Sequence, residues 1–440
     1  KEAIEQIKKR GLEGDVYSVK DRSISYSIKK GEISDSSEYE DVGLGIRVIK
    51  DDGIGFGYCV PDKEEEGVKR AIELSELPEK IDLSFPSDEN QPDVKTNDEK
   101  LREWVRDSKG AELAQKMIDG VFLVADDITP TRGLLNISIG ERIVGNTNGL
   151  LVKEESSSIS GYVTATIERE NTSLQARELQ VSRRLNIDFG EVGTRAGEKV
   201  DSMRETSEVL TGDHPVVISP YALSQLFGFG LMPAINGENV RKGKSVYKSK
   251  LGKKVASEDL SVKDDPIVDW GMGSGAFDDE GVLSRSTPII SEGVLKNFIY
   301  NLKDGVKSNT ETTANGVRNS FKSPPETVHR NIVLEGEEKR VDDLMPDKGI
   351  YVDNVLGAHT SNPVNGYFSV VTNPVWLVEE REKKGRIDGM MISGNLPEVL
   401  NSIELADDYK KCYQNIGSQR LIIETPTARL NDVTLSGRND

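Results

Sequence analysis

Two hydrophobic periods alternate along the first half of the chain. Apolar residues at every second position are typical of half-buried strands, and this period covers residues 15–30, 42–60, 133–139, 159–168 and 174–181. Apolar residues at helical spacing predict helices over residues 1–11, 64–77, 98–118 and 193–210. Asp51-Asp-Gly53 predicts a hairpin turn, because glycine tolerates a positive φ. Asn97 or Asp98 is expected to cap the third helix, and Gly110 to bend or break it.

The second half of the chain changes to short strands and many turns. Residues 211–220 are a β-branched run that predicts a buried strand, and Pro220 stands where a helix over residues 221–231 begins. Further strands are predicted over residues 349–357, 370–380, 387–392 and, as two strands, 421–437. The order of elements predicts an α+β fold. An N-terminal antiparallel sheet with helices on one face, residues 1–209, is followed by a β-rich C-terminal domain, residues 210–440.

Composition narrows the class of protein. A length of 440 residues allows two or three domains, and 41 glycines suit a strand-rich fold with many turns. A net charge of −18 argues against a nucleic-acid-binding surface, which needs clustered lysine and arginine. Cys59 and Cys412 lie far apart in sequence, and we expect reduced thiols and a cytoplasmic protein. No apolar run has the ~20 residues of a membrane helix, and no signal-peptide pattern is present. Because the first residue is Lys1, we expect a few native residues to precede it.

Six short strings follow one another in the second half of the chain. They are Lys250-Leu-Gly-Lys-Lys-Val255, Asp264-Asp-Pro266, Phe277-Asp-Asp-Glu-Gly281, Glu292-Gly-Val-Leu-Lys-Asn297, Thr313-Ala-Asn-Gly-Val-Arg318 and Ile392-Ser-Gly-Asn-Leu396. Their order resembles the C-terminal half of the TldD/PmbA family, peptidases once described as modulators of DNA gyrase. Each string is weak alone, but six in the right order are hard to obtain by chance. The resemblance implies the same arrangement, an α+β domain before a β-rich one.

The family resemblance also bears on metal binding. In the TldD branch a helix carries a His-Glu-x-x-x-His motif, and a downstream Cys completes a site of the ligands that zinc prefers. Aligned with that motif, the two His positions fall near Gly228 and Pro233, and Ser393 takes the approximate place of the Cys. The resemblance is therefore to the PmbA/TldE branch, with no metal ligand or catalytic residue in this chain and zinc only in a TldD-like partner.

Clustered charges and glycines offer other candidate sites. Asp264-Asp265 and Asp278-Asp279-Glu280 could bind a hard cation through oxygen, but Asp-Asp-Pro and Asp-Asp-Glu-Gly are also turn-forming sequences, and we favour that interpretation. Gly271-Met-Gly-Ser-Gly275 lacks the Lys-Ser/Thr ending of a phosphate-binding loop. The basic residues 241–254 are expected to form a solvated face, with attraction of an acidic peptide as the alternative.

The chain has three histidines, and they do not suggest a metal site. His214 and His329 are expected to be structural or surface residues. His359 lies in a loop that matches a glycine- and asparagine-rich stretch near the cleft of the family. The resemblance therefore makes His359, Asn362, Asn365 and Asn395 candidate peptide-cleft residues.

Three functions agree with these observations. The first is a PmbA/TldE-like subunit of a cytoplasmic metallopeptidase that processes or degrades peptides and small unfolded proteins, in which a TldD-like partner hydrolyses and this chain supplies dimer contacts and a cleft wall. Sheet edges suit such a role, because main-chain hydrogen bonds hold an extended peptide with little demand on sequence. The second is a self-sufficient peptidase with unrecognised ligands, and the third a non-enzymatic homodimeric peptide-binding scaffold. We expect a homodimer when the chain is alone, and no nucleic-acid or membrane partner. Metal content separates the first two hypotheses, and a neighbouring TldD-like gene would favour the first over the third.

Overall fold

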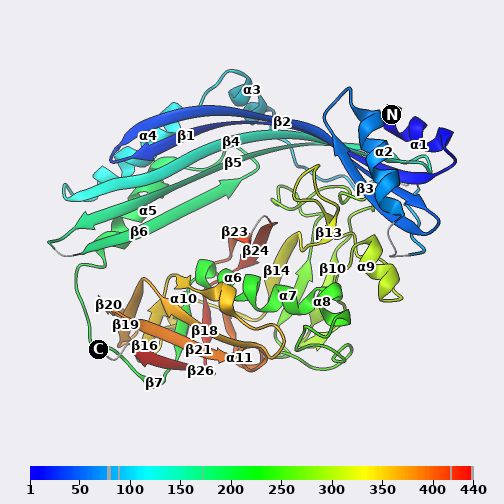
Figure 1. The fold of residues 1–440 in the computed structure, drawn as a ribbon. Helices are drawn as coiled ribbons and strands as arrows, with labels where there is room; N and C mark the ends of the chain where they lie inside the picture. Colours follow the sequence, from blue (N-terminus) through cyan, green and yellow to red (C-terminus); the bar gives the residue numbers. More distant parts are fainter. Residues whose placement is uncertain (77–80, 88–89, 171, 417–418, 438–440) are drawn as a thin grey trace.

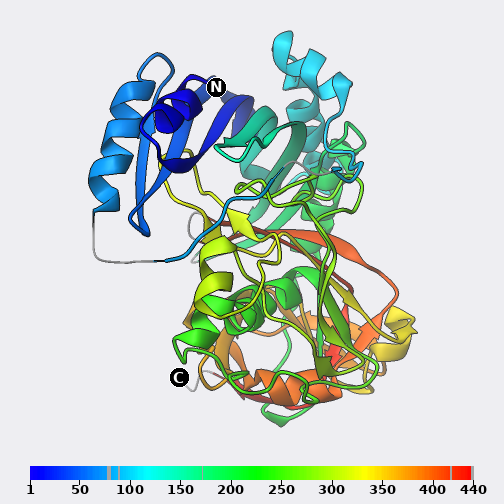
Figure 2. The same cartoon turned by 90° about the vertical axis from the view of Figure 1, so that its right-hand side faces the viewer.

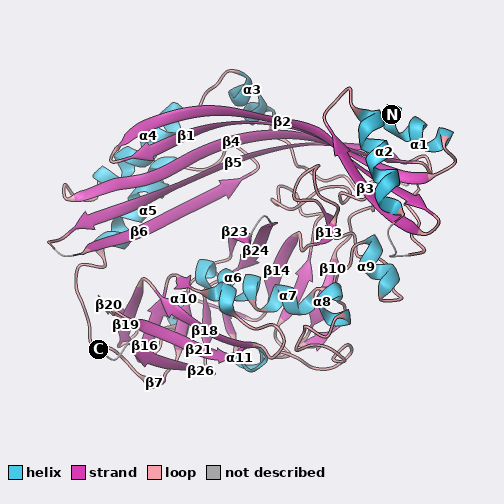
Figure 3. Ribbon diagram, viewed as in Figure 1, coloured by secondary structure: helices cyan, strands magenta, loops and turns pink. Residues whose placement is uncertain are grey.

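The N-terminal half of the chain forms one long, curved sheet that lies across a β-rich C-terminal half (Figure 1). The computed structural model describes residues 1–440 except 77–80, 88–89, 171, 417–418 and 438–440. Strands make up most of its regular structure (Figure 3). The expected α+β class, with an N-terminal sheet and helices before a β-rich region, is confirmed.

Six antiparallel strands form the N-terminal sheet in the order β3-β2-β1-β4-β5-β6. Their bounds are β1 Glu13–Lys29, β2 Glu32–Lys50, β3 Gly53–Cys59, β4 Ile128–Asn146, β5 Leu151–Glu168 and β6 Ser173–Ser182. The predicted hairpin turn lies between β2 and β3, where Asp51 and Asp52 have positive φ and Lys50 pairs with Gly53.

Helices cover one face of this sheet, in two groups. They are α1 Glu2–Lys9, α2 Glu64–Ser75, α3 Glu99–Arg106, α4 Ala111–Phe122 and α5 Phe189–Asp201. Strand β1 shows how the faces divide, since successive side chains point to opposite sides. Val16 packs with α1 and α2, and Ile24 and Tyr26 pack with α3, α4 and α5, so the two groups lie at opposite ends of the sheet (Figure 2). Tyr17 and Val19 face the other way and contact the C-terminal half.

The four predicted helices correspond to five, because the third is divided into α3 and α4, and not every boundary was correct. Asp98 caps α3 by accepting from the Lys100 N–H, and the chain breaks at Gly110, where φ is 143°. The prediction of a helix over residues 193–210 was wrong at both ends. Asp188 caps a helix that ends at Asp201. Gly193 lies inside this helix and not at its start, since it packs closely against the Met117 carbonyl of α4. The predicted end of α2 at Leu77 lies outside the described residues.

Three larger sheets and one strand pair make up the C-terminal half. The six-stranded sheet contains, in spatial order, β11 Val294–Leu295, β10 Thr287–Ser291, β9 Ser261–Asp264, β14 Asn331–Glu335, β24 Gln419–Thr425 and β23 Lys410–Ile416. The seven-stranded sheet contains β15 Glu338–Lys339, β22 Glu404–Ala406, β25 Ala428–Leu430, β8 Val216–Ile218, β16 Lys348–Val352, β19 Val375–Glu379 and β20 Glu382–Arg386. The five-stranded sheet contains β17 Val355–Leu356, β18 Tyr367–Thr372, β21 Met390–Asn395, β26 Val433–Gly437 and β7 Gly212–Asp213, and the pair is β12 Gly316–Val317 with β13 Glu326–Thr327.

A shared hydrophobic core joins these sheets to the helix that was predicted to follow residue 220. Ser219 caps α6 Pro220–Phe229, and Pro220 occupies the first helical position. The predicted uninterrupted helix to residue 231 is broken at Gly230, after which α7 Leu231–Ile235 begins. The remaining short helices are α8 Gly237–Arg241, α9 Leu302–Lys307, α10 Val341–Leu344, η1 Ala358–Thr360 and α11 Leu396–Ser402.

Candidate functional site at the junction of the two halves

The string Phe277-Asp-Asp-Glu-Gly281 forms a buried turn against the N-terminal sheet. The Asp278 carboxylate accepts hydrogen bonds from the N–H groups of Glu280 at 2.9 Å and Val282 at 3.0 Å, and of Gly316 at 2.9 Å. Burial, reinforced by the Glu280 charge, raises the pKa of Asp278. These contacts are those expected of turn-forming carboxylates.

The two other carboxylates of this string connect the turn to the N-terminal sheet. Glu280 Oε1 lies 2.6 Å from Arg47 Nη1, and Arg47 also pairs with Asp15. Asp279 Oδ1 lies 2.7 Å from Arg142 Nη1. Since a buried charge is tolerated only when it is paired and hydrogen-bonded, this network ties β1, β2 and β4 to the C-terminal half.

Asp264 has a comparable structural role in the C-terminal half. Its carboxylate accepts from the N–H groups of Arg330 at 3.0 Å and Asn331 at 2.8 Å, and from Asn315 Nδ2 at 2.5 Å. Burial raises the pKa of Asp264. Asn315 belongs to the string of residues 313–318, so several of the family strings meet in one buried network.

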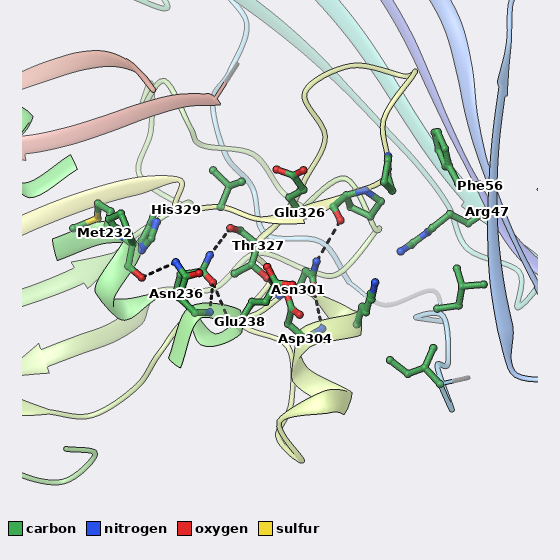
Figure 4. A pocket seen from close by; sticks show the side chains of 18 of the residues that line it. Arg47, Phe56, Met232, Asn236, Glu238, Asn301, Asp304, Glu326, Thr327 and His329 are labelled. Atoms are coloured by element: carbon green, nitrogen blue, oxygen red, sulfur yellow. Dashed lines mark hydrogen bonds between the residues drawn. The ribbon is translucent and has the colours of Figure 1, made fainter. Parts of the chain in front are cut away.

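A cavity of about 600 Å³ opens where the two halves meet (Figure 4). We call it the junction cavity. Strands β2 and β3 contribute Arg47, Ile54 and Phe56, and α6 and α7 contribute Gly228, Met232 and Pro233. The rest of the wall is formed by residues 81, 236, 238–239, 301, 303–304 and 324–329. Gly228 and Pro233, near which we expect the family's two histidines to align, therefore both lie in the wall of one cavity.

His329, for which the sequence left a structural or a surface position open, is buried in the wall of the junction cavity. Its side chain is 6% exposed, and burial lowers the pKa of the imidazole to about 3. Its Nε2 atom has no hydrogen-bond partner in the described part of the chain. By contrast, Asp304 accepts from Thr327 Oγ1 at 2.6 Å, and Asn236 Nδ2 donates to the Thr327 carbonyl at 2.8 Å. Because polar residues flank His329 in the sequence, the hydrophobic pattern does not indicate that its side chain is buried.

The four candidate peptide-cleft residues lie elsewhere. Asn395 Nδ2 donates to the Asn365 carbonyl at 2.9 Å, and the side-chain oxygens of Asn362 and Asn365 accept from Val364 N and Tyr367 N. His359 is exposed beside the end of α6, where its ring centre lies 6.3 Å from that of Phe229.

The three asparagines thus come together as turn-forming groups. None of the four residues is among those that line the junction cavity or the two cavities along β6. Their role in a peptide cleft remains a prediction.

The residues of the junction cavity do not fit a zinc ion. Gly228 and Pro233 bring no donor atom, and no group of three His, Cys, Asp or Glu side chains in the described residues could hold a metal. Cys59 and Cys412 are free and buried, and burial raises the pKa of their thiols to about 11 and about 12.

None of the described helices combines the length and the apolar character that crossing a membrane requires.

Comparison with known proteins identifies the family. The model of the PmbA/TldA metallopeptidase C-terminal domain matches residues 211–437, and those of domain 1 and the central domain match residues 14–77 and 91–204. An uncharacterized protein of Methanocaldococcus jannaschii is 27% identical over 410 residues, 90% of this chain and 93% of that protein. A metalloprotease TldD homolog of Buchnera aphidicola is 24% identical, covering 99% of this chain and 95% of its own. The crystal structure of TldE from Thermococcus kodakarensis has a TM-score of 0.89 at 26% identity, covering 99% of this chain and all of that chain. The chain belongs to the PmbA/TldD family.

Proposed function

We propose that this chain is a TldE-type subunit of a cytoplasmic two-component metallopeptidase. A TldD-like partner holds the zinc and hydrolyses peptides or small unfolded proteins, and this chain supplies dimer contacts and part of the peptide-binding surface. The observation that carries the proposal is the wall of the junction cavity. Gly228 and Pro233, near which we expect the imidazoles of the hydrolytic relatives to align, line this cavity and have no side chain that can bind a metal.

The chemistry of the junction cavity supports a non-hydrolytic role. Zinc peptidases obtain their nucleophile by lowering the pKa of bound water from ~15.7 to about 7. His329 cannot replace that effect, because a general base works best with a pKa near the operating pH, and burial holds the pKa of His329 at about 3. Restoring a ligand pair requires more than one substitution, because Gly228 lies in α6 and Pro233 in α7, on either side of the break at Gly230.

A reconstitution assay tests the proposed division of labour. Casein and unfolded peptides are incubated with this chain, with a TldD-like chain, and with both, each with and without EDTA. We expect no cleavage by this chain alone and EDTA-sensitive cleavage by the mixture. Adding zinc back after EDTA treatment is the control, and it should restore the activity of the mixture. Cleavage by this chain alone that survives repurification contradicts the proposal.

An exposed apolar face supports dimer formation. Leu356, Tyr367 and Val371 of β17 and β18 are 50%, 51% and 39% exposed, and the register places Leu356 opposite Val371. Met391 lies opposite Val371 on the next strand, so uncharged side chains continue across the sheet. We expect the isolated chain to form a homodimer, and light scattering should show a particle larger than 48.5 kDa at micromolar concentration.

A further inference from the structure

Strand β6 borders hollow space from Ser173 to Val181, and within this stretch the Arg177 carbonyl accepts from Lys199 Nζ at 3.4 Å. Strand β6 is the last of the N-terminal sheet and pairs only with β5 among the described strands. A cavity of about 750 Å³ is lined by residues 175–181, and a second of about 380 Å³ by residues 172–175. In Figure 1, β6 forms the lower edge of the sheet, directly above the C-terminal half.

The C-terminal half supplies the opposite wall of this space. Residues 408 and 410–413, at the start of β23, line the larger cavity, and residues 371–373 and 386–389 line the smaller one. Strand β23 is itself the last strand of its sheet. The two cavities are neighbours, since Gln175 and Asn373 line both, and strands β6 and β23 border the larger one. We call them together the β6 groove and define it by the residues that line these two cavities.

An uncovered strand edge presents unpaired main-chain N–H and C=O groups, which another strand can pair with. Proteins usually shorten or cover such edges, and a ten-residue edge at Ser173–Ser182 is long. Because it lies inside a groove, a second folded sheet cannot reach it easily, but a single extended chain can. At ~3.3 Å per residue, the edge spans ~33 Å, enough to pair with up to about ten residues of a peptide.

The charges of the β6 groove differ from those of the whole protein. The larger cavity is lined by five cationic and three carboxylate side chains, in a chain whose net charge is −18. The carboxylates are already occupied. Lys199 Nζ lies 3.0 Å from both Glu178 and Asp353, and Asp408 accepts from Thr427 N at 2.7 Å and from Thr427 Oγ1 at 2.8 Å.

Two lysines on the opposite wall have no such partner. Lys410 and Lys411 are exposed and form no ion pair with any described residue. Their ammonium groups are compact charges on flexible stems, so they can follow carboxylates placed at several positions along a bound strand. The groove therefore combines a strand edge, whose main-chain groups can bind a peptide of any sequence, with lysines that favour acidic side chains.

We infer that the β6 groove binds an acidic segment of an unfolded peptide as an added strand on β6, with Lys410 and Lys411 selecting carboxylate side chains. This inference rests on the proposed peptide-processing function and places peptide capture on this subunit. Main-chain pairing holds the peptide extended. The lysines raise the affinity for acidic segments in a manner that salt weakens.

Peptide binding by the isolated chain tests the charge selection. The probes are three fluorescein-labelled ten-residue peptides in which Thr or Val alternates with Glu, Gln or Lys, followed by anisotropy at low salt with EDTA present. We expect the Glu peptide to bind at least about tenfold more tightly than the Gln peptide, and the Lys peptide to bind most weakly. The variant Lys410→Glu/Lys411→Glu should bind the Glu peptide no better than the wild type binds the Gln peptide.

The control is Lys8→Glu/Lys9→Glu, which makes the same charge change on an exposed lysine pair of α1. This variant should keep the wild-type preference, because α1 lies outside the groove. Equal affinity of the wild type for the Glu and Gln peptides overturns the inference, as does an equal loss of preference in both variants.

N-methylation of the peptide tests the main-chain pairing. Two Glu peptides are N-methylated at alternate residues, one at odd and one at even positions, which removes the N–H donors of one edge and leaves charge unchanged. We expect at least one of them to lose affinity about tenfold or more. Unchanged binding of both overturns strand addition. Because neither zinc nor partner is present, these results are independent of the reconstitution assay, and either proposal can fail alone.

Discussion

Replacing Arg47 with Met tests whether the buried ion network holds the two halves of the chain together. The Arg47 side chain is 4% exposed, and those of Asp15 and Glu280 are fully buried. Met has a similar length but no charge, so the variant leaves two carboxylates without their main partner. Asp15 keeps Arg318 Nη2 at 3.7 Å, and Glu280 keeps the Leu302 N–H at 2.8 Å.

Removing one partner of a buried ion pair lowers the free energy of unfolding by about 3–5 kcal/mol. Because both carboxylates keep other contacts, we expect Arg47→Met to lie at the lower end of this range, ~3 kcal/mol. An unfolding entropy of about 2.1 cal/mol/K per residue amounts to ~0.9 kcal/mol/K for 440 residues. If both halves unfold together, the melting temperature should fall by about 3 °C. The drop should be about twice as large if only one half unfolds in the transition.

Differential scanning calorimetry measures this shift. The matched control is Arg22→Met, which breaks a cross-strand pair between the same two strands, with Glu38, whose side chains are 37% and 50% exposed. An exposed pair contributes at most about 1 kcal/mol, so the control should shift by about 1 °C or less. Equal small shifts in the two variants would refute the assignment of the network as the main tie between the halves. A double variant Arg47→Met/Glu280→Gln should lose less stability than the sum of the single changes.

Three further predictions follow from the described groups. Because burial lowers the pKa of His329 to about 3, against ~6.5 in the unfolded chain, the unfolded state binds more protons between these values and stability falls as the pH drops through that window. His329→Gln should flatten the dependence of melting temperature on pH between 4 and 6.5, and parallel curves would contradict this. Burial also lowers the pKa of the Lys383 ammonium, which lies 3.2 Å from the centre of the Tyr351 ring, to about 8. Acetylation followed by mass spectrometry should show half-maximal labelling of Lys383 near pH 8, and a midpoint equal to that of the other lysines, ~10.4, counts against it. Elemental analysis after mild dialysis should find no stoichiometric zinc, and a value near one per chain would argue for the self-sufficient peptidase.

Local patterns in the sequence predicted the elements of the N-terminal sheet well. The alternation in residues 15–30 and 42–60 corresponds to β1, to the end of β2 and to β3, and Asp51-Asp-Gly53 forms the predicted turn. Each of these signals depends only on neighbouring residues. Glycine inside a helix was a misleading signal, because in α5 a Cβ at Gly193 would lie 2.1 Å from the Met117 carbonyl oxygen of α4. That packing depends on a second helix more than 60 positions away, which local propensity does not detect.

Long-range arrangements were beyond the sequence patterns. Arg47 and Glu280 are 233 positions apart, so neither residue signals its partner. The same holds for His329, which lines one cavity with residues of α7 and β2 that are distant in sequence. The β6 groove depends on the final positions of two strand edges. The domain boundary near residue 209 also remains a prediction. One continuous sheet spans both N-terminal segments that the family models match, in agreement with a single N-terminal domain.

The buried network has an evolutionary consequence. Glu280 and Asp279 tie the two halves together, and Asp264, Asp278 and Asn315 hold the C-terminal half in shape. Gly228 and Pro233, near which we expect the family's metal ligands to align, lie in a cavity wall and take no part in those contacts. After a gene duplication, one copy can therefore exchange its hydrolytic side chains without weakening the residues that hold its architecture. Selection on folding would then act on the family strings in both copies, while selection on catalysis would act only on the few positions that hold the metal. Sequence similarity along these strings indicates common ancestry and a common fold, but it does not indicate which copy hydrolyses peptides.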